Sequence, residues 1–187
     1  MSELNKFPTI FTSSQFKKSI DKNEIDTITS SLAHTLNQRY AGEELVLIGV
    51  LKGSLTFLSD LAKKLKDIKV YVDFVKLEAV GRDKENNGTI IVKKDISTNI
   101  LDRNVLIVEE VIDTGRALEF LYTRIKQSNP RNIEIITLFD KPYKRAVNLK
   151  ANYIGKQLDD QFIVGYGLDL EDYGRNLCDI YCLEFPN

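Results

Sequence analysis

The stretch "VLIVEEVIDTGRALEFL", residues 105–121, begins with an apolar run and ends in a helix-like pattern. Glu109 and Glu110 stand side by side at the end of the run, and an Asp-Thr-Gly turn follows at 113–115. A continuous apolar run of this length is typical of a strand that is buried on both faces, as in a parallel sheet. The stretch therefore predicts a strand–turn–helix unit of an α/β fold.

The helix after the turn is predicted for 117–127, "ALEFLYTRIKQ". Its apolar residues recur three and four positions apart, so one side of the helix can pack on a sheet. They are Leu118, Leu121, Tyr122 and Ile125. Asn129 and Pro130 end the helix, because the residue before a proline avoids the helical conformation.

Strands and helices alternate along the rest of the chain. Strands are predicted at 45–51, 70–80, 104–111 and 132–140, and further helices at 21–40 and 54–65. Asp21, with Glu24 three residues later, predicts the start of the first helix, and Ser54 is a candidate cap of the second. This order predicts a mostly parallel central sheet flanked by helices, with a ligand site beyond the carboxyl ends of its strands.

Two segments lie outside this alternation. The charged segment 81–89, "GRDKENNGT", joins strand 70–80 to another β-like run and is predicted to be a mobile hairpin loop. The β-rich segment from about 150 to 187 predicts a small hood or flap over the sheet. With 187 residues and no linker or internal repeat, the chain 1–187 is predicted to form a single domain.

The composition excludes several classes of protein. Lys and Arg total 26 against 27 Asp and Glu, and a net charge of −1 gives no general field for binding nucleic acid. The chain starts without the pattern of an export signal, and its longest apolar run, 45–51, is too short to span a bilayer. Cys178 and Cys182 match neither a thioredoxin-like pair nor a four-ligand zinc site, which predicts two buried free thiols. We expect a cytoplasmic protein without nucleic-acid or membrane partners.

The turn after the 105–112 run is predicted to bind an anion. Gly115 lets backbone N–H groups approach a ligand just before a helix N-terminus. The chain has no G-x-x-x-x-G-K-[ST] motif, and "GYGLDL" at 165–170 lacks the third glycine of a dinucleotide fingerprint. Glu109 and Glu110 at a strand end could hold sugar hydroxyls or a hydrated Mg²⁺. By themselves, they could equally be solvated acids beside an ordinary helix cap.

Four segments, in order, carry a resemblance to a known family. "VLIVEEVIDTG" at 105–115 resembles the phosphoribosyl-pyrophosphate (PRPP) signature of type I phosphoribosyltransferases. "GVLKGSLTFLSDL" at 49–61, "LFDKP" at 138–142 and "FIVGYGLDLEDYGRNL" at 162–177 resemble hypoxanthine-guanine phosphoribosyltransferases, and together the segments match nearly the whole chain. The resemblance implies the type I phosphoribosyltransferase fold and the transfer of a phosphoribosyl group from PRPP to N9 of a 6-oxopurine, hypoxanthine or guanine, in purine salvage.

The resemblance also implies how PRPP is bound. Asp113 would act near purine N7 as the general base or hydrogen-bond partner. Glu109 and Glu110 would contact the ribose hydroxyls, directly or through Mg²⁺-bound water. The 5′-phosphate would be bound by the Thr114 hydroxyl and by five backbone amides, those of Asp113, Thr114, Gly115, Arg116 and Ala117. The pyrophosphate site would comprise Lys52, which the family precedes with a cis peptide, Gly53 and Arg175.

For the purine, the resemblance implies that Lys141 donates to O6 and that Phe162 stacks on the base. Ile163 and Asp169 would present backbone carbonyls to the guanine amino group. The implied cofactor is Mg²⁺, with Asp169, Glu109 and Glu110 as its ligands. The implied assembly is a homodimer or homotetramer.

Each matched residue also has an ordinary interpretation. Lys52 and Lys141 could be surface lysines, Phe162 a core residue, and Asp169 with Arg175 a structural ion pair. The joint order of the residues favours the functional interpretation over these. His34 is the only histidine and lies in the first predicted helix, so a mechanism that depends on histidine is not expected.

The chain departs from the family pattern at three places. Glu110 stands where an aspartate is usual, and Ala117 replaces a hydroxyl residue, which predicts PRPP binding weaker by about 1 kcal/mol. Ala79-Val80 take the place of a Ser-Tyr pair that closes over PRPP, so loop closure and kcat are expected to suffer.

Two other functions are weighed against a salvage enzyme. The first is a regulator that has the same fold and binds nucleotide or PRPP with little catalysis; the family residues Lys52, Asp113, Lys141 and Asp169 count against it. The second is an aspartic protease, because residues 113–115 also spell the active-site turn of that class. Such a protease needs two carboxylates in symmetric β-lobes, whereas a helical pattern follows this turn.

Overall fold

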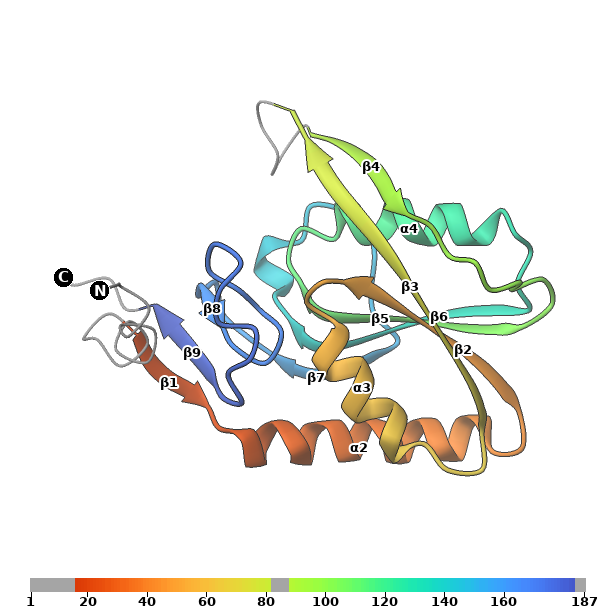
Figure 1. Cartoon of the computed structure of the whole chain (residues 1–187), viewed down its shortest axis with the longest axis horizontal. Coiled ribbons are helices and arrows are strands. Elements are labelled where there is room, and N and C mark those ends of the chain that lie inside the picture. The colour runs from red at the N-terminus through yellow and green to blue at the C-terminus, as the bar shows by residue number, and fades with distance from the viewer. Residues whose placement is uncertain (1–15, 82–87, 184–187) are drawn as a thin grey trace, which may run out of the picture.

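A computed structural model describes residues 16–81 and 88–183 of the protein (Figure 1). Its large sheet has six strands in the order β4-β3-β2-β5-β6-β7, with parallel neighbours except at the antiparallel pair β3–β4. The strands are β2 (Glu44–Leu51), β3 (Lys69–Val80), β4 (Thr89–Lys94), β5 (Asn104–Ile112), β6 (Asn132–Asp140) and β7 (Tyr153–Gln157). The predicted α/β fold with a mostly parallel sheet is confirmed.

Helices cover both faces of this sheet (Figure 1). Alternate residues of β5 face opposite sides, since Leu106 and Val108 pack with residues of α2 (Lys22–Tyr40) and α3 (Leu55–Lys64). Val105 and Ile107 pack instead with the apolar side of α4 (Arg116–Lys126). All four side chains are fully buried. The apolar run is therefore a strand between two cores, as its lack of alternation predicted.

The two predicted helix caps have different outcomes. Asp21 Oδ1 accepts hydrogen bonds from the amides of Asn23 and Glu24, at 2.7 and 3.0 Å, and so caps α2 as predicted. Ser54 occupies the predicted N-cap position of α3, but its hydroxyl donates to the carbonyl of Val50 at 2.8 Å and makes no cap bond. Ser54 is held against the strand before α3.

A second, antiparallel sheet of three strands lies beside the large one, in the order β1-β9-β8 (Figure 1). Its strands are β1 (Phe16–Ile20), β8 (Ile163–Val164) and β9 (Ile180–Leu183). We call these strands, with the 165–179 segment that joins β8 to β9, the hood. β1 comes from the N-terminal part of the chain and was not predicted.

The described cysteines, Cys178 and Cys182, are both free. Cys182 is buried on β9, but Cys178 is exposed. The prediction of two buried thiols is wrong for Cys178, because that residue precedes the first residue of β9 and lies at the surface. No helix in 16–81 or 88–183 has the length and apolarity to cross a membrane.

β3 and β4 form the predicted hairpin. Ala79 pairs with Ile90 and Val80 with Thr89, so the residues at the Ser-Tyr positions lie in the last rungs of the strand pair. Of the predicted mobile loop 81–89, residues 82–87 lie outside the described residues.

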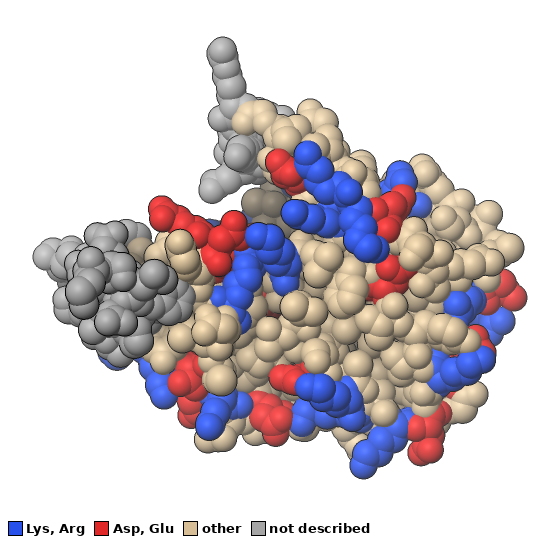
Figure 2. Space-filling model, in the orientation of Figure 1, with Lys and Arg blue, Asp and Glu red and all other residues tan. Residues whose placement is uncertain are grey.

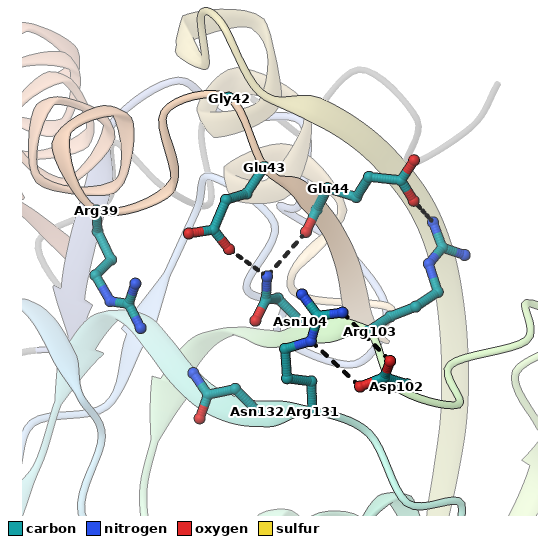
Figure 3. A pocket seen from close by; sticks show the side chains of 9 residues that line it. All are labelled: Arg39, Gly42, Glu43, Glu44, Asp102, Arg103, Asn104, Arg131 and Asn132. Carbon is teal, nitrogen blue, oxygen red and sulfur yellow. Dashed lines mark hydrogen bonds and ion pairs between the residues drawn. The ribbon is translucent and has the colours of Figure 1, made fainter.

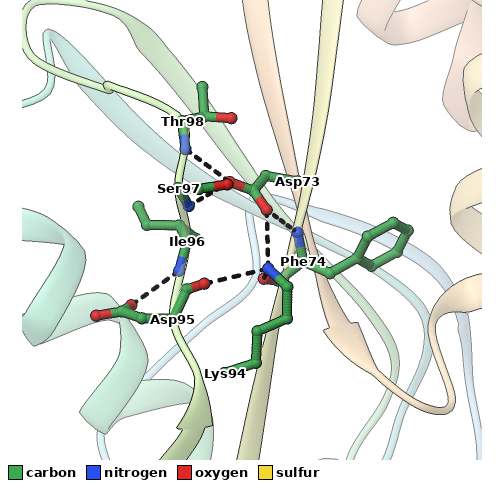
Figure 4. Close-up of polar contacts among 7 residues, drawn as sticks. All are labelled: Asp73, Phe74, Lys94, Asp95, Ile96, Ser97 and Thr98. Carbon is green, nitrogen blue, oxygen red and sulfur yellow. Dashed lines mark hydrogen bonds and ion pairs between the residues drawn. The ribbon is translucent and has the colours of Figure 1, made fainter.

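The base of the hairpin is held by Asp73, which is 7% exposed on β3 (Figure 4). Its carboxylate accepts hydrogen bonds from the amides of Phe74, Ser97 and Thr98, at 2.7, 2.6 and 2.8 Å. Lys94 adds an ion pair at 3.1 Å. Burial by itself raises the pKa of Asp73, but the three amides and Lys94 outweigh it and hold the pKa well below its ordinary value. The carboxylate therefore holds the segment after β4, at Ser97 and Thr98, against β3.

We expect Asp73→Asn to lower the free energy of unfolding by about 2 kcal/mol at pH 7. A carboxylate whose pKa falls on folding stabilises the protein above its unfolded pKa, near 4, and loses that contribution as the pH falls further. The difference between the two proteins should therefore begin to shrink as the pH falls below about 4 and continue to shrink toward the lower pKa of the folded state, as urea unfolding would measure. Asp95 lies in the same segment after β4 and forms a half-exposed ion pair with Arg124. Asp95→Asn should lower the free energy of unfolding by well under half as much as Asp73→Asn.

Candidate active site

The predicted phosphate loop connects β5 to α4 at the carboxyl edge of the large sheet. Gly115 precedes α4 with φ +79°, a conformation that favours glycine. A Cβ at this position would lie 3.0 Å from Arg145 Nη1, and the Ala146 amide donates to the Thr114 carbonyl at 2.9 Å. The 145–146 segment thus packs against the loop and holds it in place. The loop lies at the N-terminus of α4, a position that favours the binding of an anion.

Glu109 and Glu110 lie inside β5, which extends to Ile112. Both carboxylate oxygens of Glu110, and Oε2 of Glu109, are buried without a hydrogen-bond partner among the described residues. Burial raises the pKa of Glu109 to about 8. Burial also raises the pKa of Glu110 well above its ordinary value, and the neighbouring Glu109 raises it further. Unpartnered buried carboxylates of this kind are suited to binding hydroxyls or a cation.

The Glu110 side chain fills a narrow gap between two glycines. A Cβ on Gly53 would lie 2.6 Å from Glu110 Oε2, and one on Gly167 would lie 3.0 Å from both Glu110 carboxylate oxygens. Gly167 itself is so close to the loop after β2 that its Cβ would lie 2.2 Å from the Gly53 carbonyl oxygen. The hood, the β2–α3 loop and β5 therefore meet at Glu110.

Charged side chains from the β2–α3 loop and the hood meet beside this gap. The peptide bond between Leu51 and Lys52 is cis, as the resemblance implied. Lys52 Nζ lies 2.6 Å from Asp172 Oδ1. Arg175 Nη2 lies 2.5 Å from Asp169 Oδ1, and its Nη1 donates to the Gly167 carbonyl at 2.8 Å.

Lys141 is the next residue after β6, and only 4% of it is exposed. Its Nζ donates to the Gln161 carbonyl at 2.8 Å and lies 3.4 Å from Asp113 Oδ1. Phe162 follows Gln161 and is 44% exposed, so its ring is not part of the core. Ile163 is buried in β8. A buried lysine ammonium and a carboxylate therefore meet between the sheet and the hood, next to the backbone of Gln161 and one residue before the exposed Phe162.

Most of the predicted site residues lie in the three clusters described above: the phosphate loop, the surroundings of Glu110 and the surroundings of Lys141. The ordinary interpretation holds for some of these residues and fails for others. Lys141 is not a surface lysine and Phe162 is not a core residue, whereas Lys52 is exposed and Asp169 does pair with Arg175. His34 is exposed on α2. The prediction missed Gly167, Asp172 and Arg145, and only "GYG" at 165–167 gave a signal in the sequence.

The close approach of Gly167 to Gly53 gives a testable expectation. Gly167 has φ +104°, so Gly167→Ala adds backbone strain to a clash with the Gly53 carbonyl oxygen. We expect a loss of about 2 to 4 kcal/mol in the free energy of unfolding, together with a fall in activity. Gly42→Ala is the matched control, because Gly42 has φ +76° and nothing within 4 Å of its added Cβ. Equal losses in the two variants by urea unfolding would show that the hood does not press on the β2–α3 loop.

A cavity of about 640 Å³ lies at the opposite, amino-terminal edge of the sheet (Figure 3). Its charged residues largely satisfy one another, since Arg131 pairs with Asp102 at 3.2 Å and Arg103 with Glu44 at 3.4 Å. The predicted site residues do not line it. Its lining comprises Arg39, Gly42, Glu43, Glu44, Asp102, Arg103, Asn104, Arg131 and Asn132.

Comparison with known proteins places the chain in a family. Residues 18–171 match the phosphoribosyl transferase domain family. The hypoxanthine-guanine phosphoribosyltransferase of Streptococcus mutans serotype c is 38% identical over 156 residues, 83% of this chain and 86% of that protein. The chain belongs to the hypoxanthine-guanine phosphoribosyltransferase family.

Solved structures of hypoxanthine-guanine phosphoribosyltransferases share this fold. One from Bacillus anthracis, with a HEPES molecule in the active site, superposes with a TM-score of 0.86 at 38% identity, covering 90% of this chain and 98% of that chain. A hypoxanthine phosphoribosyltransferase from Staphylococcus aureus gives a TM-score of 0.88 at 32% identity, covering 95% and 98%. The family resemblance seen in the sequence is confirmed, and the chain is a phosphoribosyltransferase rather than an aspartic protease.

Proposed function

We propose that this phosphoribosyltransferase transfers the 5-phosphoribosyl group of PRPP to N9 of hypoxanthine or guanine, giving IMP or GMP and pyrophosphate. The observation that carries the proposal is the buried Lys141 beside Asp113, at the carboxyl edge of the sheet and next to the phosphate loop. A site with a fixed donor and a nearby carboxylate suits a purine that has an oxygen at C6 and a nitrogen at N7.

In this proposal the base lies against the hood. Lys141 donates to O6, which favours 6-oxopurines because adenine has an amino group at that position. Asp113 receives a hydrogen bond or proton at N7, and its half-exposed side chain is accessible to a ligand. Phe162 stacks on the ring, and the backbone carbonyls of Ile163 and Asp169 face the guanine amino group.

The phosphoribosyl group lies over the turn between β5 and α4. Amides of the 113–117 segment and the Thr114 hydroxyl hold the 5′-phosphate, where the positive end of α4 adds to the attraction. Glu109 and Glu110 face the ribose hydroxyls and the positive charge that develops on the sugar in the transition state. Lys52, the amide of Gly53 and Arg175 hold the pyrophosphate that leaves.

The carboxylates of this site fit a magnesium ion. Magnesium keeps several waters and substrate phosphate oxygens and takes only one or two protein carboxylates. Glu109 Oε2 and both carboxylate oxygens of Glu110 have no hydrogen-bond partner among the described residues, so they are available to water bound to such an ion. We propose that Asp169 ligates Mg²⁺ directly and that Glu109 and Glu110 hold it through its bound water. The bound ion would neutralise the pyrophosphate and so improve it as a leaving group.

The test is nucleotide formation by the purified protein with PRPP, Mg²⁺ and, in parallel, hypoxanthine, guanine, xanthine and adenine. The expected result is turnover of hypoxanthine or guanine without turnover of adenine. PRPP binding without turnover of any base would refute the proposal in favour of a regulator. Light scattering on the same sample would test the homodimer or homotetramer that the family resemblance implied.

A further inference from the structure

One carboxylate of the hood lies between the two cations proposed to hold pyrophosphate. Asp172 Oδ1 is 2.6 Å from Lys52 Nζ and 3.3 Å from Arg175 Nη2. Lys52 is 120 positions away in the sequence, so the contact joins the β2–α3 loop to the hood. Figure 2 shows acidic and basic side chains gathered next to one another between the hood and the β3–β4 hairpin.

The backbone of the hood presents Asp172 at this place. Its amide donates to Asp169 Oδ2 at 2.8 Å, and its φ of +68° turns the chain back toward Arg175. Asp169 also pairs with Arg175 but is only 31% exposed, whereas the Asp172 side chain is 68% exposed. Asp172 is thus the more solvent-accessible acid of the two, and water or a ligand can replace its contacts.

Both contacts are charge-assisted hydrogen bonds. Asp172 Oδ1 accepts from the Lys52 ammonium at 2.6 Å and from the Arg175 guanidinium at 3.3 Å. An ionised oxygen that accepts from a lysine and an arginine has the chemistry of a phosphate oxygen.

We propose that Asp172 takes the place of a pyrophosphate oxygen in the empty site, holding Lys52 and Arg175 together until the pyrophosphate group of PRPP displaces it. The inference rests on the proposed function, which assigns pyrophosphate to these two cations. Asp172 is then a positioning residue that competes with the ligand. It lowers the affinity for pyrophosphate and assists release of that product, since its carboxylate recaptures both cations as pyrophosphate leaves.

The competition predicts an unusual gain on mutation. Because exposed ion pairs are weak, Asp172→Asn should tighten the binding of inorganic pyrophosphate by about two- to five-fold. Asparagine also tolerates the positive φ of this position, so the hood backbone should be kept. The KM for hypoxanthine should stay unchanged, because no purine contact is proposed for Asp172.

The experiment is calorimetric titration of the full-length protein with inorganic pyrophosphate in Mg²⁺, repeated at two salt concentrations. Glu171→Gln is the matched control, since it removes the same charge one position earlier from a residue that has no ion pair in the described structure. It should leave the affinity nearly unchanged. The gain in Asp172→Asn should shrink at high salt and should also shrink in a Lys52→Met background, where one of the released cations is missing.

Weaker or unchanged binding in Asp172→Asn, or an equal gain in Glu171→Gln, would overturn the inference. A full gain in the Lys52→Met background would overturn it as well, by showing a general charge effect. A wild-type protein that binds no pyrophosphate would also overturn it. Nucleotide formation by the wild type tests the proposed function separately: turnover without a change in pyrophosphate affinity refutes only the role of Asp172.

Discussion

Asp113→Asn is expected to lower kcat about 100-fold or more with hypoxanthine and guanine, because a positioned general base contributes roughly 10²- to 10⁴-fold. Asp113 Oδ1 is buried without a hydrogen bond and lies 3.4 Å from Lys141 Nζ, at the edge of the proposed purine site. Asparagine keeps the shape of the side chain but cannot accept a proton from N7. The KM for PRPP should change by less than about five-fold, since the amides proposed to bind the phosphate remain.

Steady-state kinetics with PRPP and each base would measure this effect. Asp67→Asn is a suitable control, because Asp67 is an exposed aspartate that precedes β3 at the opposite edge of the sheet. It should leave kcat unchanged. A fall in kcat of less than about ten-fold in Asp113→Asn would mean that another group takes the proton, and the role proposed for Asp113 would be wrong.

The large sheet was predictable because its strands carry a strong local pattern. The run before Glu109 contains enough buried branched residues to identify a strand between two layers, and β6 has the bounds that the sequence predicted. β1 had no comparable pattern, since three of its five residues are exposed. It is a strand because it pairs with β9, which lies over 150 residues later in the chain.

The site divides in the same way. The turn at Gly115 was predictable, because the conformation that glycine permits is a local property. The burial of Lys141 was not, since a lysine in isolation is usually exposed and only the tertiary fold brings the Gln161 carbonyl to its ammonium. The packing of Glu110 was not predictable either, because in the sequence it is only a glutamate where the family usually has an aspartate. Its contacts with Gly53 and Gly167 exist only because three separate segments meet at its carboxylate.

Glu110 gives the departure from the family pattern a physical meaning. A Cβ on Gly53 would lie 2.6 Å from Glu110 Oε2, so a larger residue at 53 would force the end of the glutamate side chain to shift. Ala79 and Val80 are ordinary members of the β3–β4 pairing, so the missing Ser-Tyr pair leaves the hairpin itself intact.

Lys141→Met is expected to lower kcat/KM for hypoxanthine and guanine by about 10- to 100-fold, because a hydrogen bond to a charged donor is worth about 1.5 to 3 kcal/mol. Methionine has nearly the volume of the buried lysine stem, so the cavity should stay filled. The activity with adenine should remain low and unchanged. The ratio of kcat/KM for hypoxanthine to that for adenine should therefore fall by the same factor, and this ratio is the quantity to measure.

Lys144→Met tests whether the effect belongs to the buried ammonium. Lys144 lies three residues later, and its ion pair with Asp160 is partly exposed at 2.8 Å. Its loss should change the ratio by less than two-fold, about 0.4 kcal/mol, as for other surface pairs. If Lys141→Met kept its preference for hypoxanthine over adenine, O6 recognition would lie elsewhere in the site. Because Lys141 is buried between the sheet and the hood, such a result would mean that a purine bound in that space does not direct its O6 to the Lys141 ammonium.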